Sequence, residues 1–401
     1  MKFFAKYRTF LTLFLILSFL LPGCLFAGCI GERSPPAPEE IELLIQNLKN
    51  PDGRDFYESR ERLIDAGSLA VDPLILALEE DDNDFRFEVL DVLAAIGDEG
   101  AVDPLVLIVK DKDEDLELRA HALGTLGEIA ATTGNERAMD SFTQLMEDED
   151  VELHLKLTAL ETLGLNVLEV SVGSGDSSVE ERVVELLVRS LRAENETVRS
   201  VAAIYLTEGG EKAVEPLIQV LNSDESESAR TAAAGSLGSI GGDRAFEVLV
   251  NALETDESES VRGIAIHSLG SEYNEFNERA VEPLGNALRY DESAKVRKTA
   301  AETLANFGNE EAVDFLTETL EDENEALEVR EASVFSLQAI YYNFGGEKAI
   351  DTLRRNRDCE NETLRQTIED VLSEIETGEI PKPLEEGNEP LEEVEEPLEE
   401  F

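Results

Sequence analysis

Apolar and polar residues follow one another along this chain with the spacing of an α-helix. The stretch AVEPLIQVLNSD, residues 213–224, places its apolar side chains on one helical face. A polar turn follows, and then a longer apolar-striped stretch such as KVRKTAAETLANFGNE, residues 295–310, which Gly308 is expected to end. Strand signals are absent. The pattern predicts short helix pairs.

The same phrase returns at intervals of 30 to 37 residues, with one step of 45. Its first position falls at ten residues: Glu40, Ala70, Ala101, Ala138, Val183, Ala213, Ala245, Ala280, Ala312 and Ala349. A helix pair of this length cannot bury both of its apolar faces alone, so neighbouring pairs must stack. The sequence therefore predicts an all-α fold, an α-α superhelix of about ten helix pairs.

The phrase AV(D/E)PL…VR..AA..LG.IG resembles the HEAT-like repeats named after phycobilisome lyases, from residue 40 to about residue 376. Deoxyhypusine hydroxylases, which are HEAT-repeat enzymes, hold iron with paired His-Glu motifs. Here His121, His154 and His267 are followed by Ala, Leu and Ser, so that activity does not carry over. We expect each His to be a partly buried helix residue and the protein to hold no cofactor or metal.

The N-terminus has the layout of an export signal. A basic start precedes the apolar run TFLTLFLILSFLL, and a Cys follows each small-residue step in LPGC and FAGC. The layout resembles a lipoprotein signal, with Cys29 as the preferred lipidation site and Cys24 as the alternative. An uncleaved membrane helix from about Thr9 to Ile30 is the other interpretation. Both place the body on a membrane, at its extracytoplasmic face.

The chain thus divides into four segments. We expect a signal peptide over residues 1–28, a Pro-rich linker over 29–39, the solenoid over 40–376 and an acidic disordered tail over 377–401. The only thiol beyond Cys29 is Cys359, so the folded body contains no intramolecular disulfide. Packing alone must hold the exported body together.

Net charge is −55, which disfavours nucleic acid and anionic lipid as partners. An acidic surface with few Lys resembles that of proteins from salty habitats, where salt screens self-repulsion. A basic partner is the alternative explanation. The stretch DKDEDLE, residues 111–117, alternates Asp like an EF-hand loop, but Leu116 stands where the turn needs Gly, and solvated, helix-capping acidic turns are the simpler interpretation.

Two rows of charged residues recur at fixed places in the repeat. The basic row lies in the second helix and comprises Arg86, Arg119, Lys156, Arg199, Arg230, Arg262, Arg297, Arg330 and Arg365. The acidic row is at the third place of the first helix and comprises Asp72, Asp103, Asp140, Glu185, Glu215, Glu247, Glu282, Asp314 and Asp351. We interpret both rows as structural, with the basic side chains bonded to a carbonyl or carboxylate of the next repeat and the carboxylates favouring the positive helix end.

Function is expected where the repeat is interrupted, at residues 166–181, 271–279 and 340–348, because insertions often carry recognition. The last two contain aromatic side chains that are candidate partner contacts: Tyr273, Phe276, Tyr341, Tyr342 and Phe344. They could equally cover the ends of lengthened helices. Asn195 and Asn361 stand in candidate glycosylation tripeptides.

These features predict a membrane-tethered, extracytoplasmic scaffold that binds another protein through its concave surface and is not an enzyme. One alternative is a surface protein that binds a small basic ligand or a divalent cation. A second is an enzyme subunit of the lyase or hydroxylase kind, which would need a bound cofactor.

Overall fold

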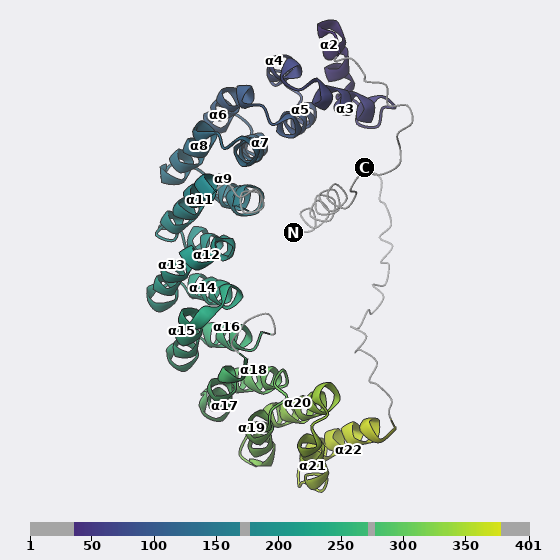
Figure 1. Ribbon diagram of the computed structural model, residues 1–401, viewed down its shortest axis with the longest axis vertical. Helices are drawn as coiled ribbons and strands as arrows, with labels where there is room; N and C mark the ends of the chain where they lie inside the picture. Colours follow the sequence, from purple (N-terminus) through teal and green to yellow (C-terminus); the bar gives the residue numbers. More distant parts are fainter. Residues whose placement is uncertain (1–35, 169–176, 272–276, 378–401) are drawn as a thin grey trace, which may run out of the picture.

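The structure is a computed structural model that describes residues 36–168, 177–271 and 277–377. Within these ranges the chain forms 20 α-helices and no strand, and the helices stack as pairs into one continuous arc (Figure 1). The predicted all-α superhelix of about ten pairs is thus confirmed. The predicted signal peptide, with Cys24, and the predicted lipidation residue Cys29 lie outside the described residues, as do residues 378–401 of the acidic tail.

The first helix of each pair lies on the outer, convex side of the arc (Figure 1). These helices are α2 (Pro38–Asn47), α4 (Ser68–Ala77), α6 (Val102–Lys110), α8 (Glu136–Glu147), α11 (Ser177–Ser190), α13 (Glu211–Ser223), α15 (Gly242–Thr255), α17 (Val281–Tyr290), α19 (Glu310–Glu321) and α21 (Glu347–Arg355). The short 3₁₀ helices η1 (Glu99–Ala101), η3 (Leu206–Gly209) and η4 (Asn277–Ala280) lead into α6, α13 and α17.

The second helix of each pair lies on the inner, concave side (Figure 1). These helices are α3 (Phe56–Ala66), α5 (Asn83–Ile96), α7 (Leu116–Thr133), α9 (Leu153–Glu161), α12 (Glu196–Tyr205), α14 (Glu227–Ile240), α16 (Glu259–Leu269), α18 (Ala294–Leu304), α20 (Leu327–Phe344) and α22 (Glu362–Thr377). A π-helical segment, η2 (Thr162–Leu168), extends α9. Each second helix packs on the second helices of the neighbouring repeats, which leaves one face toward the concavity.

Two predicted helix limits are wrong. Helix α13 begins at Glu211, two residues before the repeat marker, because Gly210 adopts a positive φ of 54° at its N-cap. Helix α18 ends at Leu304, so Gly308 does not terminate it. Gly308 instead leaves room for the ring of Phe344 from the next repeat, which would lie 2.3 Å from a Cβ at this position.

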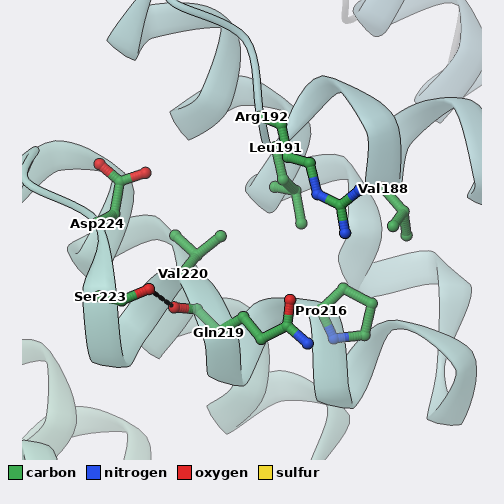
Figure 2. Close-up of a pocket in the computed structure, with 8 residues that line it drawn as sticks. All are labelled: Val188, Leu191, Arg192, Pro216, Gln219, Val220, Ser223 and Asp224. Atoms are coloured by element: carbon green, nitrogen blue, oxygen red, sulfur yellow. Dashed lines mark hydrogen bonds between the residues drawn. The ribbon is translucent and has the colours of Figure 1, made fainter.

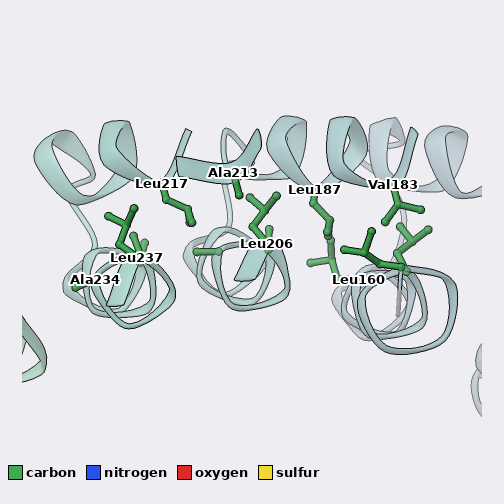
Figure 3. Packing of buried hydrophobic residues seen from close by; sticks show 14 of the residues in the cluster. Leu160, Val183, Leu187, Leu206, Ala213, Leu217, Ala234 and Leu237 are labelled. Atoms are coloured by element: carbon green, nitrogen blue, oxygen red, sulfur yellow. The ribbon is translucent and has the colours of Figure 1, made fainter. Parts of the chain in front are cut away.

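The core is one aliphatic layer between the two rows of helices. Figure 3 shows Val183, Leu187, Ala213 and Leu217 pointing from the first helices toward the second-helix row. All four are fully buried. Burying a Leu side chain stabilises the fold by about 1.5–3 kcal/mol, and these contacts recur in each repeat. The stack is therefore held mainly by repeated aliphatic burial.

Candidate partner-binding surface

A row of ion pairs with largely buried Arg side chains joins consecutive repeats. The pairs are Arg86 with Glu114, Arg119 with Glu152, Arg199 with Asp224, Arg230 with Asp256, Arg262 with Asp291, and Arg297 with Glu325. Each Arg lies near the start of a second helix, and each carboxylate belongs to the turn between the two helices of the following repeat. The interpretation of the basic row as a structural ladder is thus confirmed at these six of its nine positions.

Arg262 shows the geometry of one rung. Its Nε and Nη2 donate to the two carboxylate oxygens of Asp291, at 2.7 and 3.0 Å. Its Nη1 donates to the carbonyl of Asp256 at 2.9 Å, in the turn of its own repeat. Both side chains of the pair are only 6% exposed. One guanidinium therefore ties the turn of its own repeat to the turn of the next.

The sequence suggested that the acidic turns are solvated, but most of the turn carboxylates that meet this row are largely buried, and only Glu152, at 43% exposed, stays open to solvent. The side chains of Asp224 and Asp256 are 9% exposed. Desolvation opposes ionisation of Asp224, but hydrogen bonds from Arg199 and from the Ser226 amide outweigh it and lower the pKa. The capping role does hold in the DKDEDLE stretch, where Asp115 accepts the amides of residues 117 and 118. Within the described residues no three His, Cys, Asp or Glu side chains are grouped so as to hold a metal ion.

Among the described residues, the other three members of the basic row form no ion pair with a carboxylate of the next repeat. Arg330 donates to the Leu320 carbonyl and Arg365 to the Cys359 carbonyl. Lys156 makes no ion pair within the part of the chain that the structure describes. It lies immediately before the longest interruption of the repeat, and residues 169–176 there are outside the described ranges.

The acidic row has a function that the sequence did not suggest. On the convex side, Asp140 pairs with Arg182 at 2.6 Å, and Asp314 pairs with Lys348 at 2.6 Å. The basic partner in each pair immediately precedes the marker position of the next repeat. Asp103 pairs with Arg137, and Glu215 with Arg244, in the same way. These exposed pairs add to the connection between repeats, although each contributes only about 0–1 kcal/mol.

An uncharged strip occupies the middle of the concave surface. It is formed by exposed or half-buried residues on the free faces of α12, α14 and α16, beyond the exposed glutamate that begins each helix (Glu196, Glu227 and Glu259). We call this set the neutral strip. The neutral strip comprises Thr197, Val201, Ile204, Ser228, Thr231, Ala232, Gly235, Ser260, Gly263, Ile264 and His267. None of these eleven positions carries Asp, Glu, Lys or Arg, in a chain in which 31% of residues do. Average composition would place about three charges there.

Other second helices carry charge at the equivalent positions. On α5 these positions hold Asp84, Glu88 and Asp91, and on α18 they hold Lys295, Lys298 and Glu302. The neutral strip is therefore local to three consecutive repeats and does not reflect a general feature of the second helix. Desolvating such a surface costs little, and interface cores are depleted of charge in the same way.

The side chains of the neutral strip are small and leave the helix backbones accessible. A Cβ added at Gly235 or Gly263 would meet nothing within 4 Å. The hydroxyls of Thr197, Ser228, Thr231 and Ser260 make no hydrogen bond within the described ranges. Ile204 is the largest apolar contact here, 53% exposed. The surface thus offers a floor of mostly small side chains, free hydroxyl groups and one strongly exposed aliphatic side chain, Ile204.

Acidic groups also lie on α5 and α7, which α9 separates from the neutral strip. Asp91 on α5 accepts from His121 on α7 at 2.7 Å and lies 3.9 Å from Arg60 on α3. Burial and the nearby charge of Asp91 raise the pKa of Glu88, and one Glu88 carboxylate oxygen is buried without a hydrogen-bond partner. The same two causes raise the pKa of Glu128, although its side chain remains exposed.

The histidines do not follow the prediction uniformly. His121 is half-buried, as expected, but His154 and His267 are exposed on the concave surface. The prediction of partial burial was therefore wrong for these two residues. Apolar periodicity alone did not reveal that both occupy the free face of a second helix.

Three of the five predicted aromatic contacts lie within the described residues. Tyr273 and Phe276 lie outside the described residues. Tyr341 is half-buried against the core, while Tyr342 and Phe344 at the end of α20 are 42% and 52% exposed. Part of the Phe344 ring is used to cover Gly308. Phe335, also on the concave face of α20 and 53% exposed, was missed because no irregularity of the repeat marks it.

The two candidate glycosylation residues are exposed helix caps. The side-chain oxygen of Asn195 accepts the amides of residues 197 and 198 at the start of α12. Asn361 accepts the amide of Leu364 at the start of α22. Glycosylation at either residue stays a prediction, and capping accounts for an Asn at both.

A shallow pocket of about 330 Å³ lies between α11 and α13 (Figure 2). Val188, Leu191 and Arg192 line one side of it, and Pro216, Gln219 and Val220 line the other, with the Arg192 guanidinium pointing into the space between. Arg192 has no ion-pair partner among the described residues. The pocket is on the convex row of helices, away from the neutral strip.

In the described ranges no helix is both long and apolar enough to cross a bilayer.

Repeated helix pairs, a continuous aliphatic layer and a free concave face define an α-solenoid. The family profile of the HEAT repeats matches residues 71–164, 180–270 and 281–373, more than half of the chain. The chain therefore belongs to the HEAT-repeat family. A comparison with curated proteins found no match.

Solved structures support the same fold. Importin beta in an ammonium sulfate condition is 14% identical with a TM-score of 0.51, covering 84% of this chain and 57% of that chain. A chain of the Kap95:Nup1 complex is 12% identical with a TM-score of 0.52, covering 85% of this chain and 51% of that chain. Human deoxyhypusine hydroxylase, at 18% identity, covers 85% of this chain and 97% of that chain with a TM-score of only 0.27. This chain thus spans a little over half of the importin-type chains, and the likeness concerns the fold.

Proposed function

We propose that this protein is a scaffold that binds another protein through the neutral strip of its concave surface. The observation that carries the proposal is the absence of charge from that strip, in a chain whose net charge is −55. Selection for solubility favours charge on an exposed surface, so eleven adjacent uncharged positions need another explanation. Contact with a protein partner supplies one.

The chemistry of the strip suits a polypeptide. Free hydroxyl groups can bond to the backbone of a partner, and the glycines let that backbone approach closely. Ile204 projects from this floor as the one large aliphatic contact. Ordinary interfaces combine an uncharged centre with a polar border, and α18, which packs on α16, provides charged side chains at Lys295, Lys298 and Glu302 on one side.

We further propose that the scaffold is tethered to a membrane at its extracytoplasmic face. The support is the sequence before the solenoid, a basic start, an apolar run and the small-residue steps before Cys24 and Cys29. We propose that this segment is a lipoprotein signal and that the repeats are of the phycobilisome-lyase type. The proposed scaffold has no catalytic step and no cofactor.

A pair of charge insertions tests the proposal. Thr231→Glu places a carboxylate in the middle of the neutral strip, on a half-buried position of α14 that faces the concavity. Asn251→Glu places the same charge on the convex face of α15, at an exposed position. Each variant is expressed in the source cells at native salt, cross-linked, recovered and analysed by mass spectrometry.

We expect the unaltered chain and Asn251→Glu to recover the same dominant partner, and Thr231→Glu to lose it while melting at the unaltered temperature. Equal recovery by all three chains would contradict binding through the strip. If no partner is recovered by any of them, binding of a small basic ligand becomes the better account.

A further inference from the structure

Two neighbouring repeats depart from the others on the convex surface. The seventh position of the first helix, counted from the repeat marker, points outward and is polar in eight of the ten repeats. Those eight residues are Gln46, Gln144, Arg189, Gln219, Asn251, Asn286, Glu318 and Arg355. In the second and third repeats the position holds Leu76 and Leu107, which are 65% and 71% exposed.

Two further leucines lie on the outward faces of the same end of the arc. Leu69 on α4 is 59% exposed, and Leu43 on α2 is 62% exposed. We call Leu43, Leu69, Leu76 and Leu107 the leucine patch. Among the described residues, these four are all of the large aliphatic side chains exposed on first helices, and they belong to the first three repeats. Single exposed leucines are ordinary, but this grouping on adjacent helices needs a partner.

The position of the patch along the chain points to one occupant. The apolar run that ends at Leu21 precedes α2 by 16 residues, 22–37, which could span at most about 55 Å even if fully extended. Lipidation at Cys29 would shorten this tether to about 30 Å. The repeats that carry the leucine patch are therefore the repeats that any membrane anchor holds closest to the bilayer. A short tether also gives a weak contact a high effective concentration.

We propose that the leucine patch contacts lipid, so that the first three repeats lie with their convex face against the bilayer. This inference rests on the proposed membrane tether. It also gives the tether a consequence, because the concave neutral strip then faces away from the membrane and is open to a partner. Contact would be apolar in nature and limited to the interfacial region, as for other surface-bound helices.

Charges around the patch define which lipids suit it. Glu42, Asp72 and Glu79 are exposed on the same outward faces and have no ion pair within the described ranges. Anionic headgroups would be repelled by these carboxylates, whereas zwitterionic headgroups would not. Contact is expected with phosphatidylcholine vesicles, and it should weaken when anionic lipid is added at low salt.

The test uses the full chain reconstituted into phosphatidylcholine vesicles. A fluorescent amino acid is introduced at position 107 or, as a matched control, at position 251, which occupies the same repeat position on α15. Spin-labelled lipids in the vesicles then report contact by quenching. A third chain carries the fluorophore at position 69, and a fourth adds Leu76→Gln and Leu107→Gln to it. These changes copy the residue present at this position in other repeats and should leave the fold intact.

We expect quenching at position 107, none at position 251, and quenching at 69 that falls when both leucines are replaced. If the chain floats with the vesicles but position 107 is not quenched, the tether stands and the lipid contact is refuted. Cross-linking of position 107 to a second copy, without lipid quenching, would also refute it. A chain that does not float with the vesicles overturns the tether and this inference together.

Discussion

Replacing Arg262 by Ala removes one rung of the buried ladder and should destabilise the solenoid without touching the concave surface. Arg262 makes two hydrogen bonds to the Asp291 carboxylate and further bonds to carbonyls in its own turn. Its pKa is raised mainly by the hydrogen bonds with Asp291, so the guanidinium stays charged. The variant leaves the Asp291 carboxylate buried, with the Ser293 amide as its main remaining donor.

Removing one partner of a buried ion pair costs about 3–5 kcal/mol, because the remaining charge is left uncompensated. The matched control is Arg244→Ala. The Arg244 pair with Glu215 also joins two repeats, but its side chains are 57% and 62% exposed. Solvent screens an exposed pair, so this variant should be nearly neutral.

Urea unfolding, monitored by circular dichroism, measures the difference in free energy of unfolding between the two variants. Because long repeat arrays need not unfold in one step, amide hydrogen exchange in α16 and α18 should accompany it. We expect faster exchange there in Arg262→Ala only. Replacing Asp291 as well should cost less than the sum of the two single changes. Unchanged stability of Arg262→Ala together with lost partner binding would refute the structural interpretation of the ladder.

Three further outcomes follow from the structure. Gly285→Ala should lower the free energy of unfolding by about 1–3 kcal/mol, because a Cβ would lie 2.3 Å from the Phe315 ring. Gly235→Ala, with no neighbour within 4 Å, should raise it by about 0.5–1 kcal/mol. Urea midpoints of the two variants compare these effects. Glu88→Gln should raise the urea midpoint at pH 7 but not near pH 3.5. The pKa of Glu88 is higher in the folded than in the unfolded chain, so its ionisation destabilises the fold at neutral pH. This cost disappears as the pH falls to the unfolded pKa. The melting temperature should rise with added molar salt, since salt screens the repulsion within a chain of net charge −55; a flat or falling response would favour a basic ligand as the reason for the acidity.

The fold could be predicted from the sequence because one packing environment is repeated. The same apolar positions, and the same Arg, recur at each step, so even weak signals reinforce one another. The buried carboxylate partners could not be predicted in the same way. Asp224, Asp256 and Asp291 lie in turns whose other acidic residues look alike, and only the folded turn shows which carboxylate points inward.

The candidate surface was harder to predict than the fold. The sequence pointed to interruptions of the repeat, yet the neutral strip lies within regular repeats. Its residues are spaced along three helices and become adjacent only when second helices stack, so no contiguous motif announces them. The leucine patch has the same origin, since Leu76 and Leu107 fit the apolar composition of their helices and differ from their counterparts only in facing solvent.

Site-specific photo-cross-linking in intact cells tests the central proposal most directly. A photoreactive amino acid at position 204, in the neutral strip, is compared with one at position 251 on the convex face, at native salt. The account predicts that position 204 links to one dominant protein and that position 251 does not. Equal or absent linking at position 204 would contradict the proposal that the concave neutral strip binds a protein partner.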